Sequence, residues 1–156
     1  SYEKLSSEYV LHPLMTAVST LTVNNGSDTY TFDIGTKETA TTNDDGEEST
    51  TTTTSVMYGD SEINSSYFST FFQNLTLLKK SDTSSDKPSG KAVFTAEYKY
   101  TDGSTDTVKF YDAGGNKYLA EVNGISVGHL YKTNPSKLIE QVKTVANNKE
   151  VSDFAI

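Results

Sequence analysis

The sequence predicts an α+β fold in which antiparallel strands pack against amphipathic helices, and three observations support this class. The first is the stretch 117–145, which reads as a strand, a two-residue turn, a second strand and a helix. Its turn contains Asn123-Gly124, two residues that tolerate the positive φ required by a tight hairpin. The second is a row of apolar side chains at helical spacing after Pro135, formed by Leu138, Ile139, Val142 and Val145. The third is that a similar order of hairpins and helix occurs roughly 65 residues earlier in the chain.

The hairpin around Asn123-Gly124 leads to two predictions, one about the cap of the following helix and one about which side chains share a face of the two strands. Asn134 should cap the following helix, with Pro135 at the first helical position, where a missing N–H costs nothing. Side chains alternate along a strand, so one face should carry Tyr118, Ala120 and Val122 together with Ile125, Val127, His129 and Tyr131.

The first half of the chain follows the same plan. Residues 18–23 and 30–34 alternate apolar and polar side chains around a turn at 24–27, which predicts a hairpin. A second turn at Gly59-Asp60 joins two further short strands. Ser65 or Ser66 should then cap a helix whose buried side comprises Phe68, Phe71, Phe72 and Leu75.

Segment 36–54 differs from its surroundings in composition. It consists of Thr, Ser, Asp, Glu, Asn, Gly and one Lys, with Ala40 as its single apolar residue. Such a segment buries too little surface to offset the entropy of ordering, so its acidic, Thr-rich first part is predicted to be a mobile loop. The threonine run 50–54 is compatible with a strand, because β-branched residues suit a pleated surface.

A polar linker at 79–91, with Pro and Gly, separates the two halves. After it, alternation in 94–100 and 108–110 around a turn at Asp102-Gly103 predicts another hairpin. The chain therefore divides into 1–80 and 81–156, two tandem ββββα-like repeats, each an antiparallel sheet packed by one helix, together forming one compact unit. Outside these repeats we expect a short helix or turn in 1–13 and a short C-terminal segment led by Val151.

Composition excludes several classes of function. The 156 residues carry a net charge of −8, contain no cysteine, and supply only lysine as a basic residue. Nucleic-acid binding is therefore not expected, since it needs a cationic surface and relies on arginine for base and phosphate contacts. Disulfides, thiol chemistry and cysteine-based zinc sites are excluded. No run approaches the roughly 20 apolar residues needed to span a bilayer.

Several runs resemble the bacterial DUF4340 family, and together they span nearly the whole chain. They are Tyr9-Val10-Leu11-His12-Pro13, the stretch 29–35, Lys109-Phe110-Tyr111, the strand and turn at 118–124, and Lys149-Glu150-Val151. Val10 stands where the family usually has glycine, and segment 36–54 is longer than is typical.

The resemblance implies an extracytoplasmic, commonly lipid-anchored protein whose leader and lipidated cysteine would precede Ser1. Genes of this family sometimes lie beside genes for ABC-type transporters, which implies envelope or membrane-transporter proteins as partners. It offers no catalytic residues to carry over.

Candidate chemical groups are few. His12 and His129 are the only histidines, and neither has a carboxylate at a fixed spacing suited to zinc or acid–base chemistry. A packed, hydrogen-bonded histidine is the expectation for His129. The run 43–48 offers oxygen ligands for a cation, but it is contiguous, whereas calcium loops alternate their ligands, so a solvated acidic loop is favoured.

The other side chains that could take part in chemistry give no indication of catalysis. No nucleophile elbow or phosphate loop occurs, and a pair of carboxylates for glycoside cleavage would leave no local motif. Four tyrosines on neighbouring predicted strands either cover the sheet or form an exposed patch that anchors a protein or sugar: Tyr98, Tyr100, Tyr111 and Tyr118.

The leading hypothesis is a monomeric, non-enzymatic extracytoplasmic module that mediates protein contacts at the bacterial envelope without a metal or cofactor. The alternatives are a small-ligand or glycan-binding domain, using a groove between the repeats or the tyrosine face, and an inhibitor-like domain that presents a concave sheet to an enzyme. Pocket size distinguishes the ligand-binding alternative. A buried carboxylate pair or a histidine–carboxylate contact in a cleft would favour an enzyme.

Overall fold

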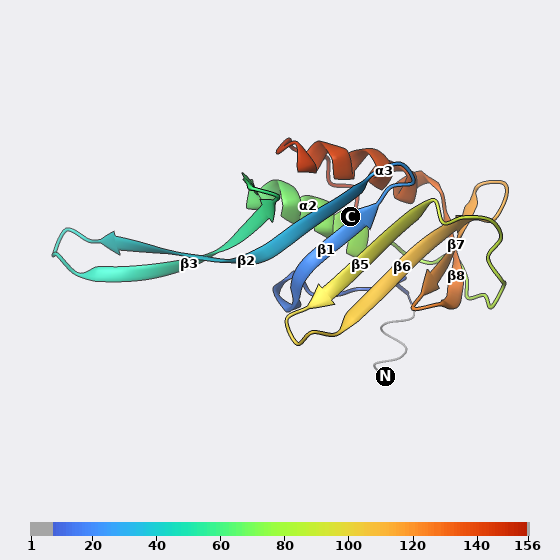
Figure 1. Cartoon of the computed structure of the whole chain (residues 1–156), viewed down its shortest axis with the longest axis horizontal. Coiled ribbons are helices and arrows are strands. Elements are labelled where there is room, and N and C mark those ends of the chain that lie inside the picture. Colours follow the sequence, from blue (N-terminus) through green and yellow to red (C-terminus); the bar gives the residue numbers. More distant parts are fainter. Residues whose placement is uncertain (1–7, 156) are drawn as a thin grey trace.

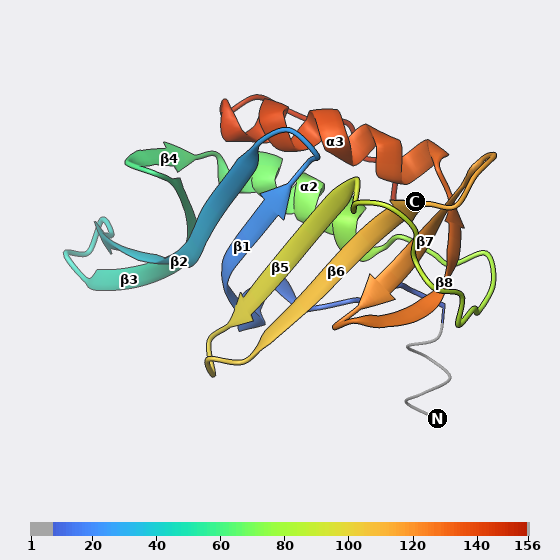
Figure 2. The ribbon, with the colours of Figure 1, turned by 45° about the vertical axis from the view of Figure 1, so that its right-hand side comes forward.

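The computed structural model describes residues 8–155 and shows one antiparallel sheet with two helices on one of its faces (Figures 1 and 2). The α+β class is confirmed. The expected short helix or turn in 1–13 falls largely outside the described residues, since only residues 8–13 of it are covered. The elements, in chain order, are the 3-10 helix η1 (Met15–Ala17), β1 (Val18–Asn24), β2 (Thr29–Thr42), β3 (Glu48–Tyr58), β4 (Ser61–Ile63), α2 (Ser65–Thr76), β5 (Phe94–Tyr100), β6 (Thr105–Asp112), β7 (Lys117–Val122), β8 (Ile125–Tyr131) and α3 (Thr133–Ala146).

All eight strands belong to one sheet, in the order β4-β3-β2-β1-β5-β6-β7-β8. The expectation of separate sheets for the two halves is therefore wrong, because β1 pairs antiparallel with β5, with Leu21 opposite Tyr98. This pairing joins the first half of the chain to the second through backbone hydrogen bonds rather than through side-chain packing alone. The two halves are therefore parts of one sheet.

The core lies between the sheet and the two helices. The predicted stripes are confirmed: Phe68 and Phe71 of α2 and Leu138 and Val142 of α3 are fully buried. The sheet contributes the alternate side chains of its central strands, namely Leu21, Val23, Phe32, Phe94, Ala96, Tyr98, Val108 and Phe110. Figure 2 shows the opposite face of β1, β5 and β6 without a covering helix. Amphipathic strands and helices thus bury their apolar sides in one two-layer core.

Segment 36–54 is not a loop. Residues 36–42 continue β2 and residues 48–54 begin β3, so that the two strands pair without interruption from Phe32↔Tyr58 to Thr42↔Glu48. Figure 1 shows this ribbon extending well beyond the rest of the sheet. Threonine is β-branched and suits a strand even where no apolar surface is buried. Pairing between the two strands offsets part of the conformational entropy that is lost on ordering. We call residues 36–54 the arm.

The predicted faces of the last hairpin are wrong beyond its turn. Val122 pairs with Ile125 as expected, but Ala120 pairs with Gly128, because a bulge shifts the register by one residue. Tyr118 therefore lies opposite Leu130 on the helix side, while His129 lies opposite Leu119 on the other face. A one-residue bulge reverses the faces to which the following side chains of the strand point. The alternation of residues 125–131 does not predict this bulge.

Both helix starts also differ from expectation. The side chain of Asn64 caps α2 by accepting hydrogen bonds from the N–H groups of Ser66 and Tyr67, so neither Ser65 nor Ser66 is the cap. Helix α3 begins at Thr133, without a side-chain cap, and not after Asn134. Pro135 still lies in the first turn, where its missing N–H has no intrahelical partner to lose.

The polar segments between and after the helices are tied to the body of the protein. Asn74, which is completely buried, donates to Gln141 of α3 and to the carbonyl of Ser152, and accepts from the N–H of Phe154. Val151 is buried but forms no strand. The C-terminal segment is thus held to both helices by part-buried hydrogen bonds to Asn74 and Gln141.

Candidate functional site: the arm and its root

The arm is exposed along its whole length. All residues from 36 to 54 are exposed, and they pair across the ribbon as Thr36↔Thr54, Thr39↔Thr51 and Ala40↔Thr50. The hydroxyls of Thr41 and Ser49 lie 2.7 Å apart across the strands. Cross-strand hydroxyl pairs of this kind supply the local stabilisation that a ribbon without a core needs.

The tip of the arm is a turn held by one asparagine. The side-chain oxygen of Asn43 accepts hydrogen bonds from the N–H groups of Asp45 (3.0 Å) and Glu47 (2.9 Å). Gly46 has a φ of 80°, a conformation that glycine adopts without strain. Since that oxygen already accepts two backbone hydrogen bonds, it is engaged in forming the turn. Within residues 8–155, no group of three or more His, Asp or Glu side chains is arranged to hold a metal ion.

Within residues 8–155, both outer edges of the arm lack a neighbouring strand. Pairing of β1 with β2 ends at Thr20↔Asp33, and pairing of β3 with β4 ends at Val56↔Ile63. Within the part of the chain that the structure describes, β2 from residue 34 and β3 up to residue 55 pair only with each other. Unpaired backbone along an edge is a template for a further strand.

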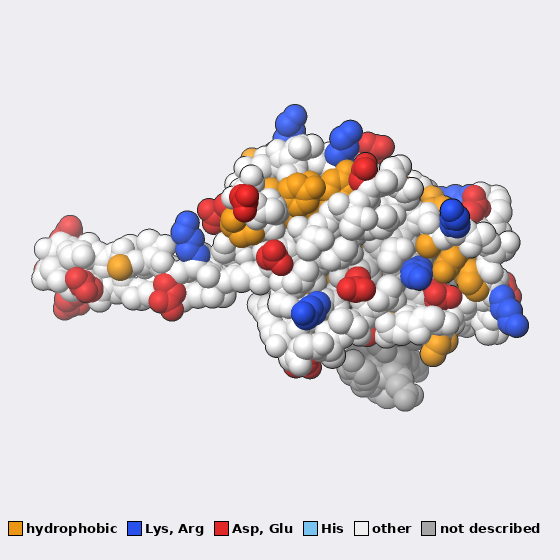
Figure 3. All heavy atoms as spheres, viewed as in Figure 1, with side chains coloured by type: hydrophobic (Ala, Val, Ile, Leu, Met, Phe, Trp, Pro, Cys, Tyr) orange, Lys and Arg blue, Asp and Glu red, His pale blue; other side chains and the backbone are white. Residues whose placement is uncertain are grey.

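The arm is acidic, and Figure 3 shows acidic side chains on its surface. It carries five acids against one lysine, a net charge of −4. Lys37 faces Glu62 of β4 at 3.6 Å. Among the described residues, none of the arm's own acids takes part in an ion pair: Glu38, Asp44, Asp45, Glu47 and Glu48. Their charge is therefore uncompensated along the ribbon.

A groove of about 700 Å³ lies where the arm leaves the sheet. Its apolar lining includes Met15, Val18 and Ile34, and the first turns of α2 supply a polar wall with Ser65, Ser66 and Ser69. Thr36 and Thr54, the first pair of the arm, complete the side toward the ribbon. We call this cavity the root groove.

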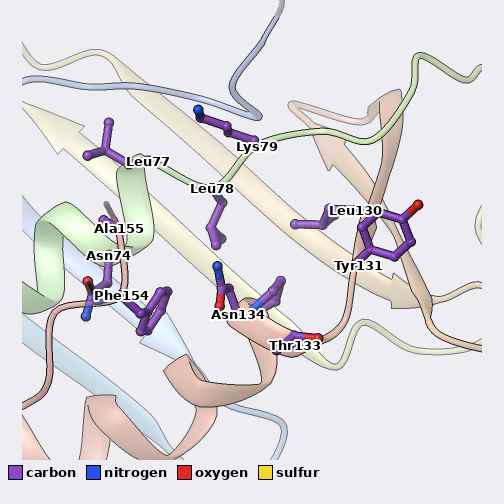
Figure 4. A pocket seen from close by; sticks show the side chains of 11 residues that line it. Asn74, Leu77, Leu78, Lys79, Leu130, Tyr131, Thr133, Asn134, Phe154 and Ala155 are labelled. Atoms are coloured by element: carbon purple, nitrogen blue, oxygen red, sulfur yellow. Dashed lines mark hydrogen bonds between the residues drawn. The ribbon is translucent and has the colours of Figure 1, made fainter.

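A second groove, of about 480 Å³, lies between the end of α2, the start of α3 and the C-terminal segment (Figure 4). Figure 4 shows Leu78 and Asn134 pointing toward one another in it. Asn74 is already hydrogen-bonded to Gln141, Ser152 and Phe154, and Lys79 pairs with Glu8 at 3.1 Å. Two of its polar residues, Asn74 and Lys79, are thus engaged with the protein itself, which does not favour a small-ligand site here.

His129 lies against two carboxylates that sequence spacing did not reveal. Its Nδ1 is 3.1 Å from Oδ1 of Asp82, and its Nε2 is 3.5 Å from Oδ2 of Asp86. The backbone N–H of His129 also donates to Asp82 (2.8 Å), which lowers the pKa of that carboxyl, with the side-chain hydrogen bond adding to the effect. Asp82 and Asp86 lie in the linker, more than 40 positions from His129 in the chain, so only the fold brings them together.

This histidine–carboxylate contact joins the linker to β8 and lines a cavity of about 460 Å³. Both ring nitrogens face carboxylates, and the nearby Ser81 hydroxyl donates to the carbonyl of His129 instead of to its ring. The linker also passes so close to β8 that a Cβ at Gly128 would meet the carbonyl oxygen of Asp82. The linker therefore covers β8, an outer strand of the sheet, and removes it as a pairing edge.

His12 is likewise engaged in holding the chain together. Its Nδ1 lies 3.1 Å from the carbonyl oxygen of Thr76, at the end of α2, and its ring stacks on Tyr9. A helix end leaves carbonyls without intrahelical partners, and the histidine meets one of them.

The four tyrosines do not form an exposed patch. Tyr98 and Tyr118 are buried on the helix side of the sheet, and burial raises the pKa of Tyr98 well above its usual value. Tyr100 is half-buried, and its hydroxyl donates to Asp106 at 2.7 Å. Tyr111, next in sequence to buried Phe110, points to the opposite face. The tyrosines thus divide between two faces, and a shared anchoring surface is not present.

No helix within residues 8–155 is both long and apolar enough to cross a membrane. Comparison with known proteins adds no relative: no family model matches the chain, and neither the curated proteins nor the solved structures contain a match.

Proposed function

We propose that this protein is a non-enzymatic module that mediates protein contacts at the bacterial envelope, with the arm as its contact surface. The observation that carries this proposal is that, among the residues the structure describes, no strand pairs with either backbone edge of the exposed ribbon. A two-stranded ribbon is only marginally stable in water by itself, and an extended segment of another protein stabilises it by adding a strand. An interaction role explains why the chain extends a polar ribbon beyond its core.

The envelope location is part of the same proposal. It is supported by the absence of cysteine and by the resemblance to the DUF4340 family, which also suggests a lipid anchor and a role accessory to an ABC-type transporter. Fractionation of cells that produce the natural protein checks the location: recovery with the envelope is expected, and recovery in the cytoplasm contradicts it.

A further proposal concerns the origin of the fold as two tandem ββββα-like repeats. The element order supports it, since four strands and a helix occur twice, and the strand order runs outward from the β1–β5 junction on both sides. If the halves are equivalent, a fragment of residues 81–156 should dimerise by placing a second β5 where β1 lies. A fragment that remains monomeric at high concentration, by sedimentation analysis, contradicts the equivalence.

Site-specific crosslinking tests the contact surface. A photoreactive amino acid is placed at Thr39 on the arm or, as a matched control, at Thr31, an exposed threonine of β2 on the uncovered sheet face. We expect defined protein adducts from Thr39 and none from Thr31.

A second variant replaces residues 37–53 by Asn-Gly, which closes β2 and β3 with a short turn. Partners captured by a reactive group outside the arm should be lost from this variant. Adducts that form equally from Thr31, or partners that persist without the arm, would exclude the arm as the contact surface.

A further inference from the structure

We infer that the arm's partner is an extended, lysine- or arginine-rich segment of another protein that adds as a strand beside β2 and inserts one apolar side chain into the root groove. This inference rests on the proposed function and specifies the chemistry of its partner. Three features carry it: the position of the open β2 edge, the groove at its start, and the uncompensated acidic charge at its far end, near the tip of the arm.

The open edge of β2 continues the line of β1. Strand β1 borders β2 only as far as Asp33, and the chain that precedes β1 leaves the sheet through η1. Beyond Asp33, residues 34–42 extend for roughly 30 Å with no strand beside them among the described residues. A strand added there would take up the position that β1 vacates and would make main-chain hydrogen bonds along the arm.

The root groove lies at the start of this edge. Ile34 and Thr36 line it, and they point to the same face of β2 as the core residue Phe32. Side chains of an added strand alternate between the two faces, so its first inward side chain faces the groove. Met15, Val18 and Ile34 there favour an apolar side chain, as in other cases of strand addition, where pockets for alternate side chains supply specificity.

Charge decides between a foreign strand and a second copy of this chain. Two arms laid side by side would bring two net charges of −4 together, and like charges on neighbouring strands are destabilising. A segment whose basic side chains lie toward the tip would instead approach the acids gathered there, since Glu38 is the only acid of residues 34–42 and the other four lie in the turn or at the start of β3: Asp44, Asp45, Glu47 and Glu48. The apolar anchor at the root and basic residues toward the tip together define the expected sequence pattern of the partner.

The test uses the whole protein and three synthetic peptides. The basic peptide has one leucine followed by alternating threonine and lysine; the acidic peptide has glutamate in place of lysine; the third is the basic peptide with methylated backbone nitrogens. Binding is followed by fluorescence anisotropy, and the site by amide chemical shifts. We expect micromolar binding of the basic peptide alone, shifts concentrated in residues 34–42, and weakening by salt.

Two sets of variants locate the binding. Neutralising the arm by Glu38→Gln, Asp44→Asn, Asp45→Asn, Glu47→Gln and Glu48→Gln should lower the affinity for the basic peptide about tenfold or more. Ser69→Phe fills the root groove from an exposed position of α2 and should have a comparable effect. Gln73→Phe, one turn further along the same helix and outside the groove, is the control and should bind normally.

Each alternative result overturns part of the inference. Equal binding of the acidic peptide refutes the charge argument, and shifts outside residues 34–42 refute the β2 edge. Concentration-dependent dimers that disappear in the arm-shortened protein would identify a second copy as the occupant. If no peptide binds while arm-dependent crosslinks from Thr39 persist, this inference fails and the proposed function stands; if the crosslinks are also absent, both fail.

Discussion

At the scale of single residues, the tightest constraint is the crossing of the linker over Gly128. A Cβ at this position would meet the backbone carbonyl oxygen of Asp82, which cannot move aside as a flexible side chain would. Gly128→Ala should therefore destabilise the protein by about 2 kcal/mol, measured by denaturant unfolding. Gly35→Ala is the control, because a Cβ there has nothing within 4 Å; an equal loss in both variants would contradict the close approach.

The buried amide of Asn74 makes a second residue-scale prediction. It links α2 to α3 and to the C-terminal segment through three hydrogen bonds. Asn74→Ala leaves buried partners unsatisfied and should lower the free energy of unfolding by roughly 3 kcal/mol. Asn147→Ala, an exposed residue whose side chain bonds within its own helix, should change it by less than about 0.5 kcal/mol. Comparable losses would show that Asn74 is not a specific fastening.

The decrease in the stability of the protein at acidic pH should depend on Asp82. Hydrogen bonding lowers the pKa of Asp82 in the folded protein, as it does for Asp102 and Asp112. A depressed folded pKa contributes stability above the unfolded pKa of about 3.9, and that contribution is lost as pH falls through the folded value. Asp82→Asn should make the decline of the melting temperature below about pH 4 shallower. A decline identical to that of the unmodified protein would contradict this role.

At the scale of elements, the arm should be dispensable for folding. Its residues are all exposed, so replacing 37–53 by Asn-Gly removes no buried apolar surface. We expect the shortened protein to keep its melting temperature within about 3 °C, measured by circular dichroism. A larger decrease in melting temperature would mean that the arm stabilises the core. The arm-shortened variant could then not be used in the crosslinking experiment, which would rely on the comparison of Thr39 with Thr31.

Elements were predictable from sequence wherever an apolar pattern had a core to face. Phe68 and Phe71 in α2 and Leu138 and Val142 in α3 repeat at helical spacing, and all four are buried as that spacing requires. The arm was not predictable, because its stability comes from pairing between two polar strands and leaves no hydrophobic alternation. The bulge in β8 and the cap at Asn64 also escaped, since each depends on a local backbone choice that several neighbouring residues could have satisfied.

The candidate site was predictable from the sequence only in part, because its geometry also depends on local backbone choices and on contacts between distant segments. The acidic, threonine-rich composition of 36–54 identified the unusual segment, but its open edges follow from where β1 and β4 end. The pairing of His129 with Asp82 depends on the path of a linker with no regular structure. Contacts between distant segments carry no signature in a single sequence.

At the scale of the whole molecule, the β1–β5 pairing should make unfolding a single transition. The halves share one sheet, and Asn74 of α2 is hydrogen-bonded to Gln141 of α3, so unfolding of one half exposes the core of the other. Calorimetric and van't Hoff enthalpies should therefore agree. Two separate transitions would show that 1–80 and 81–156 are independent domains.

Alkaline conditions provide a second whole-molecule test. Burial raises the pKa of Tyr98 and Tyr100 above the usual value of tyrosine. Their contribution is fully present below about pH 10 and is lost as pH rises, because the unfolded chain ionises first. The last part of the tyrosinate absorbance, from Tyr98 and Tyr100, should therefore appear together with unfolding. Complete ionisation in a protein that remains folded would contradict the burial of Tyr98.

The continuity of β2 has a mechanical consequence. One uninterrupted strand runs from Thr29, beside β1 in the body of the sheet, to Thr42 at the end of the ribbon. A pull on the tip is therefore transmitted along that strand, and the hydrogen bonds to β1 lie perpendicular to it. Such a load shears the five β1–β2 residue pairs together instead of opening them one after another, so the root of the arm resists a force applied along β2.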